Sequence, residues 1–95
     1  MVRRRASKVV LRIKQCAQDG LLLFCDHARR EMNDDNFNEA DVTAAIQKGD
    51  LVARQTHGEC GTRYVMRGTF PDGREMEVVC RIAGSSVRIV TVYRV

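Results

Sequence analysis

Apolar residues near the start of the chain recur at the spacing of an amphipathic helix. Between residues 6 and 19, lysine, arginine and glutamine alternate with the apolar residues Val9, Val10, Ile13, Cys16 and Ala17. Residues three and four apart share one face of a helix, so the pattern predicts a helix over 6–19 with one apolar and one basic face. Gly20 is a residue type that commonly ends helices, and it marks the expected stop.

The next thirty residues predict one extended segment and two short helices. Leu21–Cys25 is short and apolar, which is typical of a strand or extended segment. Asp26 is the expected N-cap of a second helix over 27–33. A third helix is expected over 38–48, where an asparagine cap is followed three residues later by Asp41, the spacing of a capping box.

After residue 50 the pattern changes to a period of two, which is the signature of β-strands. The four predicted strands are 51–55, 62–70, 74–83 and 87–95. Glycine-containing segments separate them, so consecutive strands should pair as an antiparallel meander. Helices first and strands second predict one α+β domain over residues 1–95, with N-terminal helices packed on one face of a C-terminal antiparallel sheet.

Alternation along each predicted strand assigns its side chains to the two faces of the sheet. The face expected to meet the helices carries Tyr64, Met66, Phe70, Met76, Val78, Cys80, Ile82, Val87, Ile89, Thr91, Tyr93 and Val95. The opposite face carries Val65, Val79, Val90, Val92, Glu75 and Glu77 together with five arginines, namely Arg63, Arg67, Arg81, Arg88 and Arg94. Arginine forks match phosphate geometry, so the five together would bind an anion. The alternative is that they only keep an exposed face soluble.

Composition narrows the class of protein. The chain has 95 residues, 44% of them hydrophobic, which is enough for one modest core. Its apolar runs are far shorter than the roughly 20 residues that a membrane span needs. Lys8, Arg12 and Lys14 interrupt the apolar residues near the N-terminus, so no secretory segment is predicted. A cytoplasmic location without a membrane partner is expected.

The net charge of +4 conceals segments of opposite sign. Residues 1–30 carry +6, residues 31–50 carry −5 and residues 51–95 carry +3. Basic segments suit an anionic partner such as RNA. The acidic segment would repel phosphate or dock a basic protein, and an ordinary solvated surface is the other interpretation.

Several short motifs, taken in order, resemble one protein family. They are Asp26–Met32, Phe37–Val42, Ile46–Gly49, Arg63–Val65, the hairpin at Gly73, and Val90–Tyr93. Their order and spacing are similar to family 4258 of the bacterial domains of unknown function, over roughly residues 22–95. Members of that family resemble compact RelE-type and barnase-type ribonuclease toxins and often occur beside antitoxins. The resemblance therefore implies a toxin-like domain that binds or cleaves RNA, with a cognate antitoxin as protein partner.

The resemblance transfers to individual residues. His27 stands where the family has its helix-start histidine. Arg63 and Tyr64 match the family's strand motif, and Thr91 and Tyr93 match its closing strand.

Two positions depart from the family. The family commonly has arginines four and eight residues after the histidine, where this chain has Glu31 and Asp35. Neighbouring Arg29 and Arg30 point in other directions, because consecutive helix residues are rotated by about 100°. The departure favours a different class of function, a non-catalytic protein-interaction module. Its acidic docking surface would consist of Glu31, Asp34, Asp35, Glu39 and Asp41.

Cleavage of RNA by its own 2′-hydroxyl needs a proton acceptor, a proton donor and cations around the phosphate. The expected catalytic residues are His27, Arg63, Arg81 and Tyr93. The residues expected to bind RNA are Arg29, Arg30, Arg67, Arg88 and Arg94. Two simpler interpretations stay open: His27 could bond to the sheet as a helix-start residue, and Tyr64 and Tyr93 could be core aromatics. Unpaired strand edges also leave a homodimer open.

No cofactor is expected, and metal binding has weak candidates. Cys25, His27, His57 and Cys60 could supply two thiolates and two imidazoles for zinc, but their spacing is unlike that of a common zinc finger. A zinc-stabilised domain is therefore a third hypothesis. Scattered cysteines in an apolar-rich chain are expected to be reduced, and Cys16 and Cys80 lie on predicted apolar faces.

Overall fold

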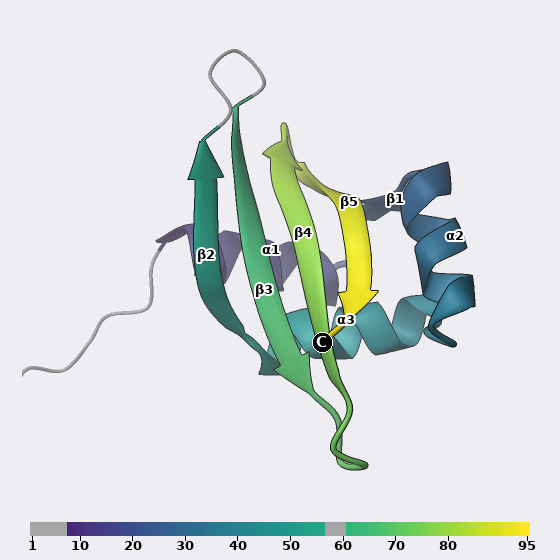
Figure 1. Ribbon diagram of the computed structural model, residues 1–95. Coiled ribbons are helices and arrows are strands. Elements are labelled where there is room, and N and C mark those ends of the chain that lie inside the picture. The colour runs from purple at the N-terminus through teal and green to yellow at the C-terminus, as the bar shows by residue number, and fades with distance from the viewer. Residues whose placement is uncertain (1–7, 57–60) are drawn as a thin grey trace, which may run out of the picture.

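The computed structural model describes residues 8–56 and 61–95 and contains helices and one sheet (Figure 1). The elements in chain order are α1 Lys8–Gln18, β1 Leu22–Phe24, α2 Asp26–Asp34, α3 Glu39–Lys48, β2 Asp50–Thr56, β3 Thr62–Thr69, β4 Glu75–Ala83 and β5 Ser86–Arg94. Each predicted helix and strand is present, with bounds that differ by one or a few residues. The chain is thus an α+β protein, as the order of the sequence patterns predicted.

The sheet is mixed and not purely antiparallel, which corrects the sequence prediction. Its strand order is β1-β5-β4-β3-β2. The last four strands form the predicted antiparallel meander, whereas β1 pairs with β5 in parallel, with Leu22 opposite Val87 and Phe24 opposite Ile89. A segment of three residues carries no local signal for its partner or its direction, so this pairing depends on tertiary structure.

Two helices cover one face of the sheet, and the third lies beside its β1–β5 edge. In Figure 1, α1 and α3 lie behind the strands, and α2 lies next to β5. We call the face opposite α1 and α3 the open face, because no helix of the described chain covers it. Nor is any helix in the described ranges long and apolar enough to cross a membrane.

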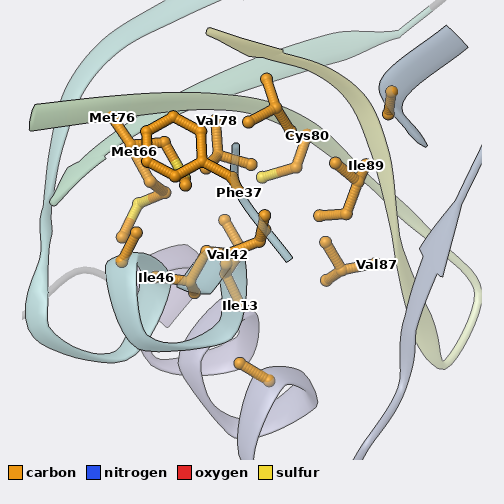
Figure 2. Close-up of a cluster of buried hydrophobic side chains, with 14 of the residues drawn as sticks. Ile13, Phe37, Val42, Ile46, Met66, Met76, Val78, Cys80, Val87 and Ile89 are labelled. Atoms are coloured by element: carbon orange, nitrogen blue, oxygen red, sulfur yellow. The ribbon is translucent and has the colours of Figure 1, made fainter. Parts of the chain in front are cut away.

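The core lies between α1, α3 and the sheet, as Figure 2 shows. Ile13 comes from α1, and Val42 and Ile46 come from α3. Fully buried side chains of β3, β4 and β5 complete the cluster, namely Met66, Met76, Val78, Cys80, Val87, Ile89 and Val92. The core is mostly aliphatic, as the composition predicted, and burial of this apolar surface is the main force that holds helices and sheet together.

Helix capping agrees with the sequence at one helix and differs at another. At α3 the Asn38 side chain accepts from the Asp41 amide at 2.8 Å, and the Asp41 side chain accepts from the Asn38 amide at 2.9 Å, which forms the predicted capping box. At α2 the predicted cap was wrong. Cys25 is the N-cap, with its Sγ accepting from the Ala28 amide at 3.4 Å, and Asp26 is the first helical residue, where its charge complements the helix dipole.

A register shift in β5 corrects the predicted faces of its last residues. Val79 pairs with Thr91 while Cys80 pairs with Ile89, so Val90 is an extra residue between them. Such a bulge reverses the alternation beyond it. Val92 is therefore fully buried in the core, although the sequence predicted it on the opposite face with the five arginines.

The same bulge exchanges the predicted places of Tyr93 and Arg94. Tyr93 pairs with Glu77 and lies on the open face, whereas Arg94 pairs with Met76 on the helix side of the sheet. The shared surface of five arginines therefore loses Arg94, and Thr91, opposite Val79, also moves to the open face.

The close approach of α3 to β3 depends on a glycine. A Cβ atom added at Gly68 would lie 2.5 Å from the Ala45 Cα and 2.7 Å from its carbonyl oxygen. Backbone atoms of a packed helix cannot move aside as a flexible side chain would.

We expect Gly68→Ala to lower the free energy of unfolding by about 1–3 kcal/mol, because α3 must shift to make room. Urea denaturation of both proteins measures this. Gly20→Ala is the comparison variant, because a Cβ atom at Gly20 meets no other atom within 4 Å. The φ of +73° at Gly20 adds backbone strain of its own. Equal stability of wild type and Gly68→Ala would contradict the tight packing.

Candidate functional site

Three of the predicted arginines form one row across the open face. Arg81 pairs with Arg88 between β4 and β5. Tyr64 pairs with Cys80, so the register brings Arg63 of β3 opposite Arg81. We call Arg63, Arg81 and Arg88 the arginine row. Neighbouring strands are about 4.8 Å apart, so the row spans roughly 10 Å at the level of the backbone.

Arg63 has an unusual environment for a cation on a sheet surface. Its Nε is buried and has no hydrogen-bond partner among the described residues. Buried polar atoms are nearly always bonded, so an orphan of this kind needs a physical explanation. Since this Nε is buried, an anion on the open face would meet Arg63 through its two terminal nitrogens. Arg88, at the other end of the row, is exposed.

A row of small and apolar residues lies next to the arginine row. Val65 pairs with Val79, and Ala53 and Thr91 flank this pair in β2 and β5. Val65 and Val79 are buried, although they lie on the face that no described helix covers. Long arginine side chains can cover neighbouring apolar surface with their methylene groups. Side chains of the open face therefore already cover these two valines.

A second polar group, which we call the Glu77 cluster, consists of Arg67, Glu77 and Tyr93 from three adjacent strands. Arg67 donates to Glu77 Oε2 from Nε at 2.9 Å and also from Nη2. The Tyr93 hydroxyl donates to the other carboxylate oxygen, Oε1. The three side chains thus form one continuous hydrogen-bonded chain across β3, β4 and β5.

The contacts of the Glu77 cluster shift the acidities of its members. The Tyr93 hydroxyl and the Arg67 guanidinium lower the pKa of Glu77, because both donate to the ionised carboxylate. The hydrogen bond to Glu77 raises the pKa of Tyr93. The hydrogen bond and the charge of Glu77 likewise raise the pKa of Arg67. At neutral pH the cluster therefore holds an ionised carboxylate between a protonated phenol and a guanidinium cation.

The two register shifts of the sheet each turn a side chain toward this cluster. The bulge at Val90 turns Tyr93 onto the open face. The other register shift lies between Leu51 and Ala53 and places Asp50 opposite Arg67. Without these two bulges, Tyr93 and Asp50 would lie on the helix side of the sheet. Bulges commonly redirect side chains next to functional sites.

His27 lies on α2. Its Nε2 is 3.2 Å from Glu31 Oε1, one helical turn later. The same carboxylate oxygen accepts from the Val92 amide at 3.2 Å, and Asp35 accepts from the Arg94 amide at 3.0 Å. Because β1 pairs with β5 only as far as Ile89, these α2 carboxylates bind the edge amides that β1 does not reach.

The structure divides the expected catalytic residues among three places. Arg63 and Arg81 lie together in the arginine row, and Tyr93 lies in the Glu77 cluster. Glu77 and Arg81 are four residues apart on β4, or roughly 13 Å along the strand. His27 contacts Glu31 on α2. Tyr64 packs against the core and carries Arg54 over its ring at 5.4 Å.

The residues expected to bind RNA are also dispersed. Arg67 belongs to the Glu77 cluster, and Arg88 to the arginine row. Arg29 pairs with Glu39 at 2.6 Å and lies 5.4 Å over the Phe24 ring. Its guanidinium group therefore forms an ion pair between α2 and α3. Arg30 is exposed on α2.

The zinc candidates are not assembled in the part of the chain described. Residues 8–56 and 61–95 contain no group of three or more His, Cys, Asp or Glu side chains placed to hold a metal ion. The Cys25 thiol is the N-cap of α2, and its Sγ also donates to Val90 O at 3.6 Å. His57 and Cys60 lie outside the described residues. Cys16, Cys25 and Cys80 are free thiols, and burial raises the pKa of Cys80 to about 12.

Sequence reasoning missed the role of Glu77. Alternation placed it correctly on the same face as Arg67, and opposite charges at facing positions are a recognisable cross-strand signal. The signal was incomplete, because Tyr93 was assigned to the other face.

Taken together, the fold and the site define a small α+β domain with an arginine-bearing open sheet face. The family model for the domain of unknown function DUF4258 matches residues 24–94, and the chain belongs to that family. Comparison with curated proteins and with solved structures found no match in either.

Proposed function

We propose that this domain binds single-stranded RNA on its open face, with the phosphates held by the arginine row. The observation that carries the proposal is the alignment of Arg63, Arg81 and Arg88 on three adjacent strands. Guanidinium groups on neighbouring strands of one face present several forked donors to one stretch of phosphate backbone.

The open face favours a single strand over a duplex. Tyr93 is exposed there, and its ring offers a platform on which an unpaired base could stack while the phosphates contact the arginines. Sequence-tolerant proteins that bind single strands combine a cationic track with apolar or aromatic platforms. A duplex hides its bases and would leave the Tyr93 ring unused.

The acidic residues of the rival interaction module are largely engaged within the protein. Glu31 and Asp35 bind the edge amides of β5, and Asp41 completes the capping box of α3. Glu39 pairs with Arg29, whereas Asp34 is exposed. These contacts explain the acidic segment by internal structure, so RNA binding is the better-supported proposal. A toxin–antitoxin context and a cognate antitoxin stay predictions from the family resemblance.

Titration of isotope-labelled protein with an unstructured RNA of about eight nucleotides tests the proposal. We expect amide chemical shifts to change around Val65, Val79 and Arg81 and to stay constant around Asp34 on α2. A duplex of the same length should produce weaker changes. Shifts confined to α2 and α3, or no shifts at all, would reject the open face as the RNA site.

A further inference from the structure

The Glu77 cluster contains the three chemical groups that RNA transesterification requires. Cleavage by the ribose 2′-hydroxyl needs a base for that hydroxyl, an acid for the leaving 5′-oxygen and a cation for the charge on phosphorus. Glu77 is a carboxylate, Tyr93 is a phenol and Arg67 is a guanidinium, and each touches the next. Of the catalytic residues expected from the sequence, Tyr93 belongs to this cluster.

We propose that Glu77, Arg67 and Tyr93 form a catalytic centre that cleaves single-stranded RNA without a metal ion. This inference rests on the proposed function, since the arginine row would hold the substrate. It assigns the proton acceptor to Glu77 in place of His27. The substrate class is RNA with a free 2′-hydroxyl next to the cleaved bond.

The proposed step conserves atoms and charge. The Glu77 carboxylate takes the proton of the 2′-hydroxyl, and the 2′-oxygen forms a bond to phosphorus. The bond from phosphorus to the 5′-oxygen breaks, and Tyr93 gives its proton to that oxygen. The products are a 2′,3′-cyclic phosphate and a 5′-hydroxyl.

The hydrogen bond between Tyr93 and Glu77 restores the starting state. After the step, Glu77 holds a proton and Tyr93 lacks one. Since the two groups are direct hydrogen-bond partners, the proton passes from the carboxyl group to the phenolate. No oxidant, metal or further co-reactant is needed.

The cluster is accessible enough to meet a substrate. The Arg67 side chain is 42% exposed and that of Glu77 is 12% exposed, and Tyr93 is also exposed. The bonds to Glu77 use Nε and Nη2 of Arg67, so Nη1 is the nitrogen that would meet a phosphate oxygen. Placement of this group on the same face as the arginine row lets one RNA chain reach both.

The test is incubation of the full chain with 5′-labelled single-stranded RNA in excess chelator, with analysis of products on a denaturing gel. We expect wild type to yield fragments that end in a 2′,3′-cyclic phosphate. An RNA whose 2′-hydroxyls are all methylated should stay intact. Glu77→Gln, which keeps the side-chain shape but lacks the basic carboxylate, should cleave at least about 100-fold more slowly.

A matched variant separates catalysis from loss of an ion pair. Glu39→Gln makes the same chemical change in the Arg29–Glu39 pair on the helices and should cleave at the wild-type rate. RNA affinity of Glu77→Gln should stay within a few-fold of wild type, which shows that the binding face is intact. Tyr93→Phe should also slow cleavage.

The outcomes distinguish this inference from the proposed function. Wild type that binds RNA but leaves it uncut overturns the catalytic centre and keeps RNA binding. Full cleavage by Glu77→Gln also overturns it, as does loss of cleavage in His27→Ala while Glu77→Gln stays active. Absence of RNA binding by wild type rejects the proposed function and the catalytic centre together.

Discussion

Replacement of both Glu31 and Asp35 by alanine is expected to lower the free energy of unfolding by about 2–4 kcal/mol. Val92 and Arg94 would each lose the carboxylate that accepts from their backbone amide. A partly buried donor without a partner costs about 1–3 kcal/mol, and the more exposed donor at Arg94 costs less because water can replace the carboxylate. Chemical denaturation monitored by circular dichroism measures the loss.

The conservative double variant Glu31→Gln with Asp35→Asn separates hydrogen bonding from charge. Amide side chains retain an acceptor oxygen, so this protein should lose less than half as much stability as the double alanine variant. Asp34→Ala, an exposed position on the same helix, is the control for helix composition and should be near neutral. Equal losses at Asp34 and at the double alanine site would contradict the edge-capping role of α2.

These contacts also give Glu31 and Asp35 a role within the protein. From the sequence, the two acidic residues were interpreted as part of an acidic docking surface. In the structure the spacing of four residues aligns His27, Glu31 and Asp35 on one side of α2, next to the edge of β5. Nothing local in the sequence indicated that this edge would lie there, since β5 is about sixty residues further along the chain.

Whether the sequence correctly predicted the face on which a side chain lies depends on the pairing register of its strand. In β3 and β4 the pairing register is unbroken, so alternation correctly placed Met66, Val78 and Cys80 in the core and Arg63 and Arg81 on the other face. In β5 four β-branched residues, 89–92, follow one another through the bulge, and such a run does not reveal an extra residue.

The candidate site was therefore predictable only in part. The arginine row follows from alternation before the bulge, and it needed no tertiary information beyond strand order. The Glu77 cluster depends on the reversed side-chain direction of Tyr93, which only the register between β4 and β5 reveals. From the sequence, Glu77 was assigned to the correct face, but its hydrogen bond to Tyr93 was not predicted.

Replacement of Arg63, Arg81 and Arg88 by glutamine is expected to remove most of the salt-dependent affinity for single-stranded RNA. Three phosphate contacts predict a slope of about −2 in a plot of log affinity against log salt concentration. Wild type should therefore bind about 20-fold more weakly at 200 mM than at 50 mM salt because of these contacts. The triple variant should lose that part of the slope, which fluorescence anisotropy with a labelled RNA would measure.

A second triple variant with the same net charge decides whether the row is a site or only part of a basic surface. Lys8, Arg30 and Lys48 are exposed, one on each helix, and their replacement by glutamine removes three charges away from the open face. If position matters, this protein keeps the wild-type slope while the row variant does not. If both slopes fall equally, attraction is diffuse, because long-range steering depends on total charge and only direct contacts depend on where each arginine lies.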